Sequence, residues 1–270
     1  MSTTTAVARG EWTKMTSIPL VGRVVLWATL VAVGVTAALA AALGSRERYC
    51  AESGTCVNPA PPSGPEVATA GVLGDGLPGA ALIALMVFGA LVVLVDHRYR
   101  TIGTTWMVTP ARHRVLLTQA ALVGAVAFLV ALSATLLSGV AFAWLGGPAA
   151  DGYSPVSGVA WQLAARTALM VALAAVLAVG LAGALRRTPV VLALVIVWPA
   201  LVESLLPSLV PGGGESVAVL LPFNNLRHFV GLADGLDFHW GPWGSAAYFA
   251  AVTAGVLAAG VVSTQRARFT

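Results

Sequence analysis

Six long apolar runs divide this sequence, and they restrict its fold more than any other feature. The runs cover residues 18–43, 77–95, 115–145, 159–185, 190–206 and 245–262. A helix needs about 20 apolar residues to cross the hydrocarbon core of a bilayer, and each run approaches or exceeds that length. Backbone polar groups inside a bilayer must be satisfied within the protein, which a helix achieves by itself. The sequence therefore predicts an all-α membrane protein with about six transmembrane helices.

The composition indicates lipid, rather than water, as the main solvent of this chain. Of its 270 residues, 58 % are hydrophobic and 10 % are charged, whereas a water-soluble domain carries about 25 % charged residues. Residues 1–17 are mostly polar, and the apolar run after them is too long for the core of a cleavable signal peptide. We therefore expect residues 1–17 to form a cytoplasmic interfacial arm that leads into a retained span.

The basic residues indicate the orientation of the spans. If the N-terminus lies inside the cell, eleven of the fifteen Lys and Arg residues fall in inside segments, and eight of the eleven acidic residues fall in outside loops. Cytoplasmic loops are enriched in Lys and Arg, so we expect both termini inside. The basic residues occur in short clusters between apolar runs, as orientation signals do. We therefore exclude nucleic acid as a partner, although the net charge is +4.

This topology divides the chain into a transmembrane domain at 18–262 and a cytoplasmic tail at 263–270. Within the domain, residues 44–76 form an outer loop, residues 96–114 form an inner loop, and residues 207–244 form an outer segment broken by Pro and Gly. The chain is rich in Ala, Val, Leu and Gly and uses Arg far more often than Lys, which suggests a GC-rich bacterial genome. We expect a multi-pass protein of the bacterial inner membrane.

Two pairs of residues stand out as structural candidates. Cys50 and Cys56 share the first outer loop, which faces an oxidising compartment, so we predict a disulfide between them. Arg166 and Glu203 fall inside the fourth and fifth runs, near their outer ends. Ionisable residues inside a membrane usually have partners and are functional candidates, so we predict that these two interact. The alternative is that Arg166 snorkels and Glu203 is merely interfacial.

The motifs of catalytic and metal sites are absent from the sequence. The four His residues lack the short spacing with Cys or carboxylates that metal sites use, and no nucleophile motif occurs. A Walker A loop needs a Lys that reaches the phosphates; Lys14 is the single Lys, and no glycine-rich loop precedes it. We therefore expect no catalytic, cofactor or metal residues in this chain, and any ATP-driven work would need a separate ATPase.

The inner loop carries the residues that resemble a known family. Residues 96–106 read DHRYRTIGTTW, and residues 109–117 read TPARHRVLL. This run resembles the loop after the second span of type-2 ABC transporter permeases, especially actinobacterial ones, in which the segment is a coupling helix that contacts the ATPase. Arg100 departs from the family pattern, since relatives commonly have Gly there. The EWTKMTS stretch at 11–17 resembles the family's interfacial segment, and the LPFN stretch at 221–224 resembles part of its short re-entrant outer helices.

The resemblance implies that the chain is the permease subunit of an ABC exporter that moves a lipid, a drug or another amphipathic substrate outward. It implies a homodimer, or a heterodimer with a sister permease, in contact with membrane lipid. Two copies of a separate ATPase would hold ATP and Mg. The residues expected to couple to the ATPase are Asp96, Arg98, Arg100, Thr104, Thr105, Trp106, Met107, Arg112 and Arg114. The residues themselves leave two alternatives open: a non-transporting membrane scaffold or assembly subunit, and an integral-membrane enzyme.

Overall fold

The computed structural model describes residues 9–10, 12–13, 19–53, 64–73, 79–98, 112–211, 213–233 and 235–266. Within these ranges the chain is helical and contains no strands. Five helical segments in the described residues are long and apolar enough to cross a membrane. They are α2 (Pro19–Ser53), α6 (Arg112–Leu145), α7 (Gly158–Leu185), α12 (Pro242–Arg266) and the continuous run of α8 (Thr188–Val197), η2 (Trp198–Val202) and α9 (Glu203–Ser208).

The positions of these helices match the apolar runs of the sequence. The second run, at 77–95, corresponds to α4 (Ala80–Arg98), a shorter apolar helix of 19 residues. The structure thus confirms the all-α class, with five helices of spanning length where the sequence predicts about six. One boundary differs clearly, because α2 continues to Ser53 through the charged residues after its apolar run. Gly44 lies against the backbone of Gly146 there, so that part of α2 packs beside the end of α6.

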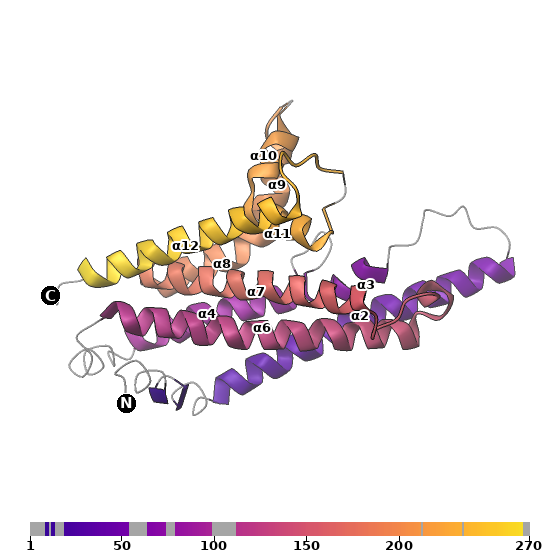
Figure 1. Cartoon of the computed structure of the whole chain (residues 1–270), viewed down its shortest axis with the longest axis horizontal. Coiled ribbons are helices and arrows are strands. Elements are labelled where there is room, and N and C mark those ends of the chain that lie inside the picture. The colour runs from indigo at the N-terminus through magenta and orange to yellow at the C-terminus, as the bar shows by residue number, and fades with distance from the viewer. Residues whose placement is uncertain are drawn as a thin grey trace.

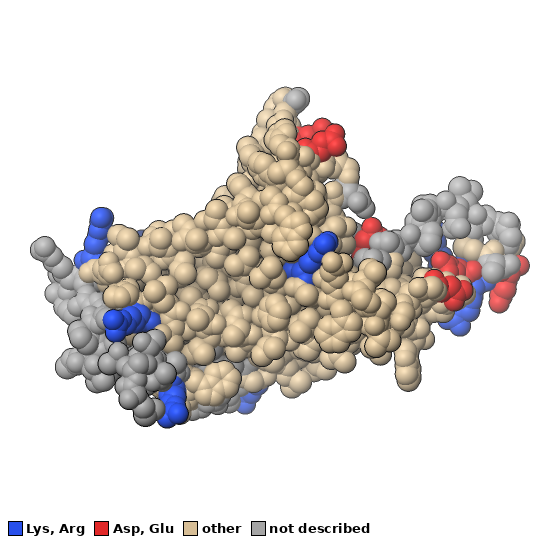
Figure 2. Space-filling model, viewed as in Figure 1, with Lys and Arg blue, Asp and Glu red and all other residues tan. Residues whose placement is uncertain are grey.

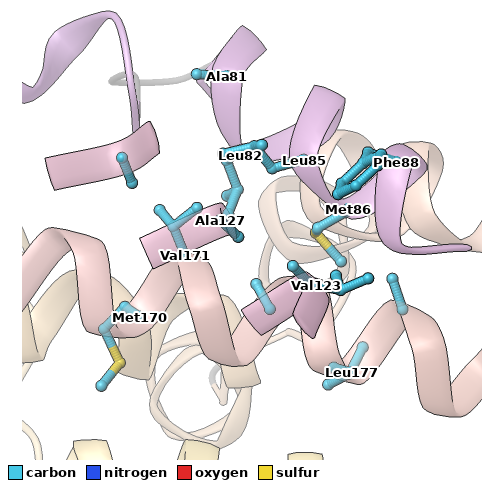
Figure 3. Close-up of a cluster of buried hydrophobic side chains, with 14 of the residues drawn as sticks. Ala81, Leu82, Leu85, Met86, Phe88, Val123, Ala127, Met170, Val171 and Leu177 are labelled. Carbon is cyan, nitrogen blue, oxygen red and sulfur yellow. The ribbon is translucent and has the colours of Figure 1, made fainter. Parts of the chain in front are cut away.

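Helix α7 lies at the centre of the bundle. In an 18-residue stretch of α7, 67 % of the residues are buried, against 22 % for α2. Its neighbours are α4, α6 and α12, and α2 packs on the outer side of α6 and α4 (Figure 1). Figure 3 shows how Leu85 and Met86 of α4 meet Val123 of α6 and Leu177 of α7 in one apolar layer.

Glycines allow α7 and α12 to approach closely. A Cβ atom added to Gly260 would lie 2.7 Å from the carbonyl oxygen of Gly180, and one added to Gly180 would lie 2.8 Å from the nitrogen of Leu257. Small residues at such contacts let helix backbones pack tightly in membranes, where burial of apolar area provides little driving force. The two helices also end together, since the Arg186 guanidinium and the Ser263 carbonyl form a hydrogen bond.

Short helices connect the long ones. Helix α3 (Gly64–Ala70) precedes α4, and η1 (Gly147–Ala150) follows α6. Helices α10 (Gly214–Leu220) and α11 (Pro222–Val230) lie between α9 and α12. Helices α9 and α10 project from the side of the bundle, whereas α11 lies along the first turns of α12 (Figure 1). The outer segment predicted at 207–244 therefore contains short helices.

The two ends of the bundle differ in their distribution of charged residues. We call one end of the bundle in Figure 1 the basic end. Helices α2 and α6 begin there, and α4, α7 and α12 end there. The described residues there include Arg23, Arg114, Arg186, Arg187 and Arg266. We call the opposite end the acidic end. Figure 2 shows several Lys and Arg side chains at the first end, whereas Asp and Glu lie towards the second end, together with some Lys and Arg, and on the projecting helices.

Candidate functional site

The run that contains α8 and α9 is interrupted by a wider helical turn. Pro199 follows Trp198, and a proline has no N–H to donate to the helical ladder. The chain forms the π-helical turn η2 at this point, and the N–H of Glu203 donates to the carbonyl of Trp198, five residues earlier. Single π-turns inside α-helices often mark functional positions. Here the turn directs Glu203 towards α11.

Glu203 is buried and fastens the first turn of α11. Its side chain is 5 % exposed. The backbone N–H groups of Phe223 and Asn224 donate to its two carboxylate oxygens at 2.9 Å each, and the Trp198 indole N–H donates at 3.2 Å. The N-cap residue of α11, Leu221, has no side-chain acceptor. Glu203, which belongs to α9, therefore takes the place of a local N-cap side chain for α11. It provides the hydrogen-bond acceptors and the negative charge that stabilise a helix N-terminus.

Two Asn residues tie α10 to α11. The Asn224 side chain donates to the carbonyl of Ala218 at 3.0 Å. Asn225, which is fully buried, donates from its amide nitrogen to the carbonyls of Val219 and Leu221, at 2.7 and 3.0 Å. These contacts satisfy the last carbonyls of α10, which have no partner within their own helix. The turn between the two helices is therefore fixed by side chains.

A further set of polar contacts joins α11 to α12. The Trp240 indole N–H lies 3.0 Å from Asn225 Oδ1 and 2.9 Å from Ser245 Oγ. His228 Nδ1 lies 2.8 Å from the same Ser245 oxygen, and its ring stacks on Phe238 with 3.9 Å between the centroids. Burial lowers the pKa of His228 below its ordinary value of 6.5. We call Glu203, Asn224, Asn225, His228, Trp240 and Ser245 the outer polar cluster.

The predicted pairing of Arg166 with Glu203 is not the arrangement in the structure. The Arg166 guanidinium carbon lies 5.5 Å from the ring centroid of Phe229, a cation–π geometry. Glu203 is engaged by backbone N–H groups and an indole, and Arg227 is the cation that lines a cavity with it. Among the described residues the pair forms no ion pair. The two residues contact α11 at separate places, Arg166 at Phe229 and Glu203 at the first turn.

At the basic end, the two helices that flank the inner loop are joined by a buried hydrogen bond. Gln119 Nε2 of α6 donates to Asp96 Oδ2 of α4 at 2.9 Å. Asp96 is 5 % exposed and Gln119 is 2 % exposed. Asp96 was predicted to be a charged handle for a soluble partner, and the structure corrects this, because the carboxylate points into the α4–α6 contact. It therefore holds the start of the inner loop.

The other predicted coupling residues fall into two groups. Arg114 is exposed in the first turns of α6, at the basic end. Arg98 and Arg112 are the last residue of α4 and the first of α6, and their side chains lie outside the described part of the chain. The remaining predicted residues also lie outside the described residues: Arg100, Thr104, Thr105, Trp106 and Met107.

The predicted disulfide and the absence of metal-site motifs are the remaining sequence-based expectations. Cys50 lies in the last turns of α2, and Cys56 lies outside the described residues, so their disulfide stays a prediction. In the described part of the chain, no three His, Cys, Asp or Glu side chains gather as metal ligands would.

Sequence reasoning missed several residues of the two sites. Gln119, Trp198, Asn225 and Ser245 were not singled out, because isolated polar residues near apolar runs usually carry no specific signal. The Pro after Leu221 was one available signal, since it marks a helix start that lacks a local capping side chain.

Comparisons with protein-family models, curated proteins and solved structures gave no match to this chain.

Proposed function

We propose that this chain is the membrane subunit of an ATP-driven exporter in the bacterial inner membrane. In this proposal it pairs with a second permease subunit and moves a lipid, drug or other amphipathic molecule outward. Two copies of a separate ATPase bind ATP and Mg and supply the energy. The chain itself carries no Walker A loop, because Lys14 is its single Lys and no glycine-rich loop precedes it.

The contact between Asp96 and Gln119 supports the proposal in addition to the apolar helices. The inner loop connects α4 to α6 in the sequence, and the Asp96–Gln119 hydrogen bond holds these two helices together. A loop that transmits force from a soluble partner must be attached firmly to the spans that it moves. A buried hydrogen bond to a carboxylate provides such an attachment, since breaking it leaves a charge in a low-dielectric environment.

The proposed orientation places the basic end in the cytoplasm. Support comes from the gathering of Arg side chains at that end and from the distribution of Asp and Glu towards the other (Figure 2). Lys and Arg are enriched in cytoplasmic loops of membrane proteins. With this orientation the inner loop faces the compartment that contains ATP, and the outer polar cluster faces the opposite side.

The decisive experiment measures association with the ATPase and ATP hydrolysis together. The tagged chain is purified from its native membrane, and a co-purifying subunit is tested for Walker motifs and for ATP hydrolysis. We expect Trp106→Ala to reduce the recovered ATPase, because buried aromatic anchors carry much of the energy of protein interfaces. The matched control is Trp144→Ala, which changes an exposed Trp at the end of α6, towards the acidic end.

The proposal fails if the inner loop is irrelevant to association. A variant that carries Trp106→Ala and the reversed charges Arg98→Glu, Arg112→Glu and Arg114→Glu should lose the ATPase while still inserting into the membrane. Full recovery of the ATPase with this variant would exclude the loop as the docking site. A membrane scaffold would show no stimulation of ATP hydrolysis by any lipid or drug.

A further inference from the structure

An apolar cavity lies inside the bundle beside α8. Its volume is about 300 Å³, at the lower limit of the ~300–1,000 Å³ that small-molecule sites usually have. It is enclosed by α8 and η2 together with α4, α7, α11 and α12. Its lining consists of apolar residues and Trp198, and it includes Leu194 of α8 and Val252 and Val256 of α12.

Two other cavities share wall residues with this one. A more open groove of about 450 Å³ follows α8 and η2, and it shares Leu194 and Trp198 with the apolar cavity. A smaller cavity of about 80 Å³ shares Pro199 and Phe223 with it. We call the three together the α8 channel.

The two ends of the α8 channel differ in polarity. The open groove is lined entirely by apolar residues and Trp198, between Pro189 and Val202. The small cavity is lined in part by Glu203, Asn224 and Arg227. The channel therefore changes from apolar to polar along its length, towards the outer polar cluster.

We propose that the α8 channel binds a phospholipid, with one alkyl chain in the apolar cavity and groove and the phosphodiester at the polar cavity. The apolar length lies between helices of spanning length, where lipid tails are the surrounding solvent. At the polar end, the Arg227 guanidinium carries several N–H groups, and the Asn224 amide has a second N–H besides the one that donates to the carbonyl of Ala218. A phosphodiester offers acceptor oxygens for such groups. The Glu203 carboxylate is already held by three N–H donors, so its charge is partly compensated.

The inference requires only that the chain spans a membrane. It does not rest on the proposed exporter function, and its test involves no ATPase, so the failure of either can be recognised separately.

The test uses a phosphatidylethanolamine probe that carries a photoreactive diazirine in one alkyl chain. The full-length chain is reconstituted in vesicles of phosphatidylethanolamine and phosphatidylglycerol that contain this probe, irradiated, and mapped by mass spectrometry. Leu194→Trp places a larger side chain in the channel. The matched control, Ile196→Trp, makes the same addition on an exposed position of α8 that lines neither apolar cavity.

We expect the wild type and Ile196→Trp to be labelled at the α12 segment around Val252 and Val256. Leu194→Trp should reduce this labelling about tenfold and leave labelling of the exposed face of α2 unchanged. A second filling variant, Val256→Phe, with Val262→Phe as its exposed control, covers the possibility that Leu194→Trp fails to fold.

Two results would overturn the inference. One is equal labelling of the α12 segment in the wild type and in both folded filling variants. The other is competition by dodecyl maltoside as effective as competition by unlabelled phosphatidylethanolamine, since the phosphodiester would then contribute nothing.

Discussion

Glu203 Oε1 lies 2.9 Å from the backbone nitrogen of Phe223, twenty residues later in the chain. The contact joins the end of a membrane-length helical run to the start of α11. Because Glu203 also accepts from Asn224 and Trp198, this single side chain sets the position of the outer polar cluster relative to α8.

Replacing Glu203 with Gln should destabilise the protein. The amide keeps one acceptor oxygen, so at least one N–H group of α11 loses its partner, which costs about 1–3 kcal/mol when the group is buried. The measurement is the apparent midpoint of thermal unfolding in detergent. The control is Glu215→Gln, an exposed position in the first turn of α10. A midpoint for Glu203→Gln equal to that of the wild type would contradict the capping role.

Gln119→Leu should also lower the unfolding midpoint. The substitution removes a donor to the buried Asp96 carboxylate, and hydrogen bonds to charged groups contribute about 1.5–3 kcal/mol. Gln162→Leu makes the same chemical change at an exposed position of α7 and serves as control. If both variants unfold at the wild-type temperature, the hydrogen bond between Gln119 and Asp96 does not hold α4 to α6.

Gly260→Val tests the close contact between α7 and α12. Its side chain would meet the Gly180 carbonyl, with Cβ only 2.7 Å from the oxygen, and overpacking of this kind costs about 1–3 kcal/mol or more. Gly255→Val is the control on the same helix, because nothing lies within 4 Å of its added Cβ. Similar unfolding midpoints for the two variants would show that the helices can separate without loss of stability.

The stability of the outer polar cluster should depend on pH through His228. Burial lowers the pKa of His228 in the folded state, so the unfolded chain binds the proton more readily. The stability that neutral, buried His228 contributes is fully present above the pKa that His228 has in the unfolded chain. It is lost as the pH falls through the pKa that His228 has in the folded protein. Unfolding midpoints measured from about pH 8 to about pH 5 should therefore fall less steeply for His228→Gln than for the wild type. His239→Gln, at an exposed position, should retain the wild-type profile; if it flattens the profile as strongly, His228 is not the responsible group.

The orientation can be tested by labelling single cysteines. Arg187 is exposed at the basic end, and Asp151 is exposed beyond the end of α6. On a background with Cys50→Ser and Cys56→Ser, we expect a membrane-impermeant maleimide added to intact cells to label Asp151→Cys and not Arg187→Cys, because basic segments stay inside. Both cysteines should react after permeabilisation. The opposite pattern in intact cells would reverse the topology.

The sequence was sufficient to locate the helices, because lipid requires long apolar segments that stand out from the loops. The sequence was less informative about where a helix ends when the helix continues beyond its apolar run. Residues 44–53 contain charges and were assigned to a loop, yet α2 continues through them because Gly44 lets the helix pack against Gly146.

The contacts of the candidate sites were harder to predict for a different reason. Glu203 and Arg166 both carry charge at a similar predicted depth, and depth alone does not distinguish an ion pair from two separate contacts with α11. Asp96 was assigned to an exposed loop, but it falls inside the last turn of α4, where its direction depends on the packing of α6. Such directions follow from tertiary structure and not from the local pattern.

The π-helical turn at Trp198–Val202 sets the register between two parts of the chain. An α-helix advances about 100° per residue, so one extra residue in a turn rotates everything that follows by that angle. Deleting one residue here would restore regular winding and turn α9 until Glu203 pointed away from Phe223. The length of this segment is therefore fixed more strictly than its composition, and a single-residue deletion would be more harmful than most substitutions in it.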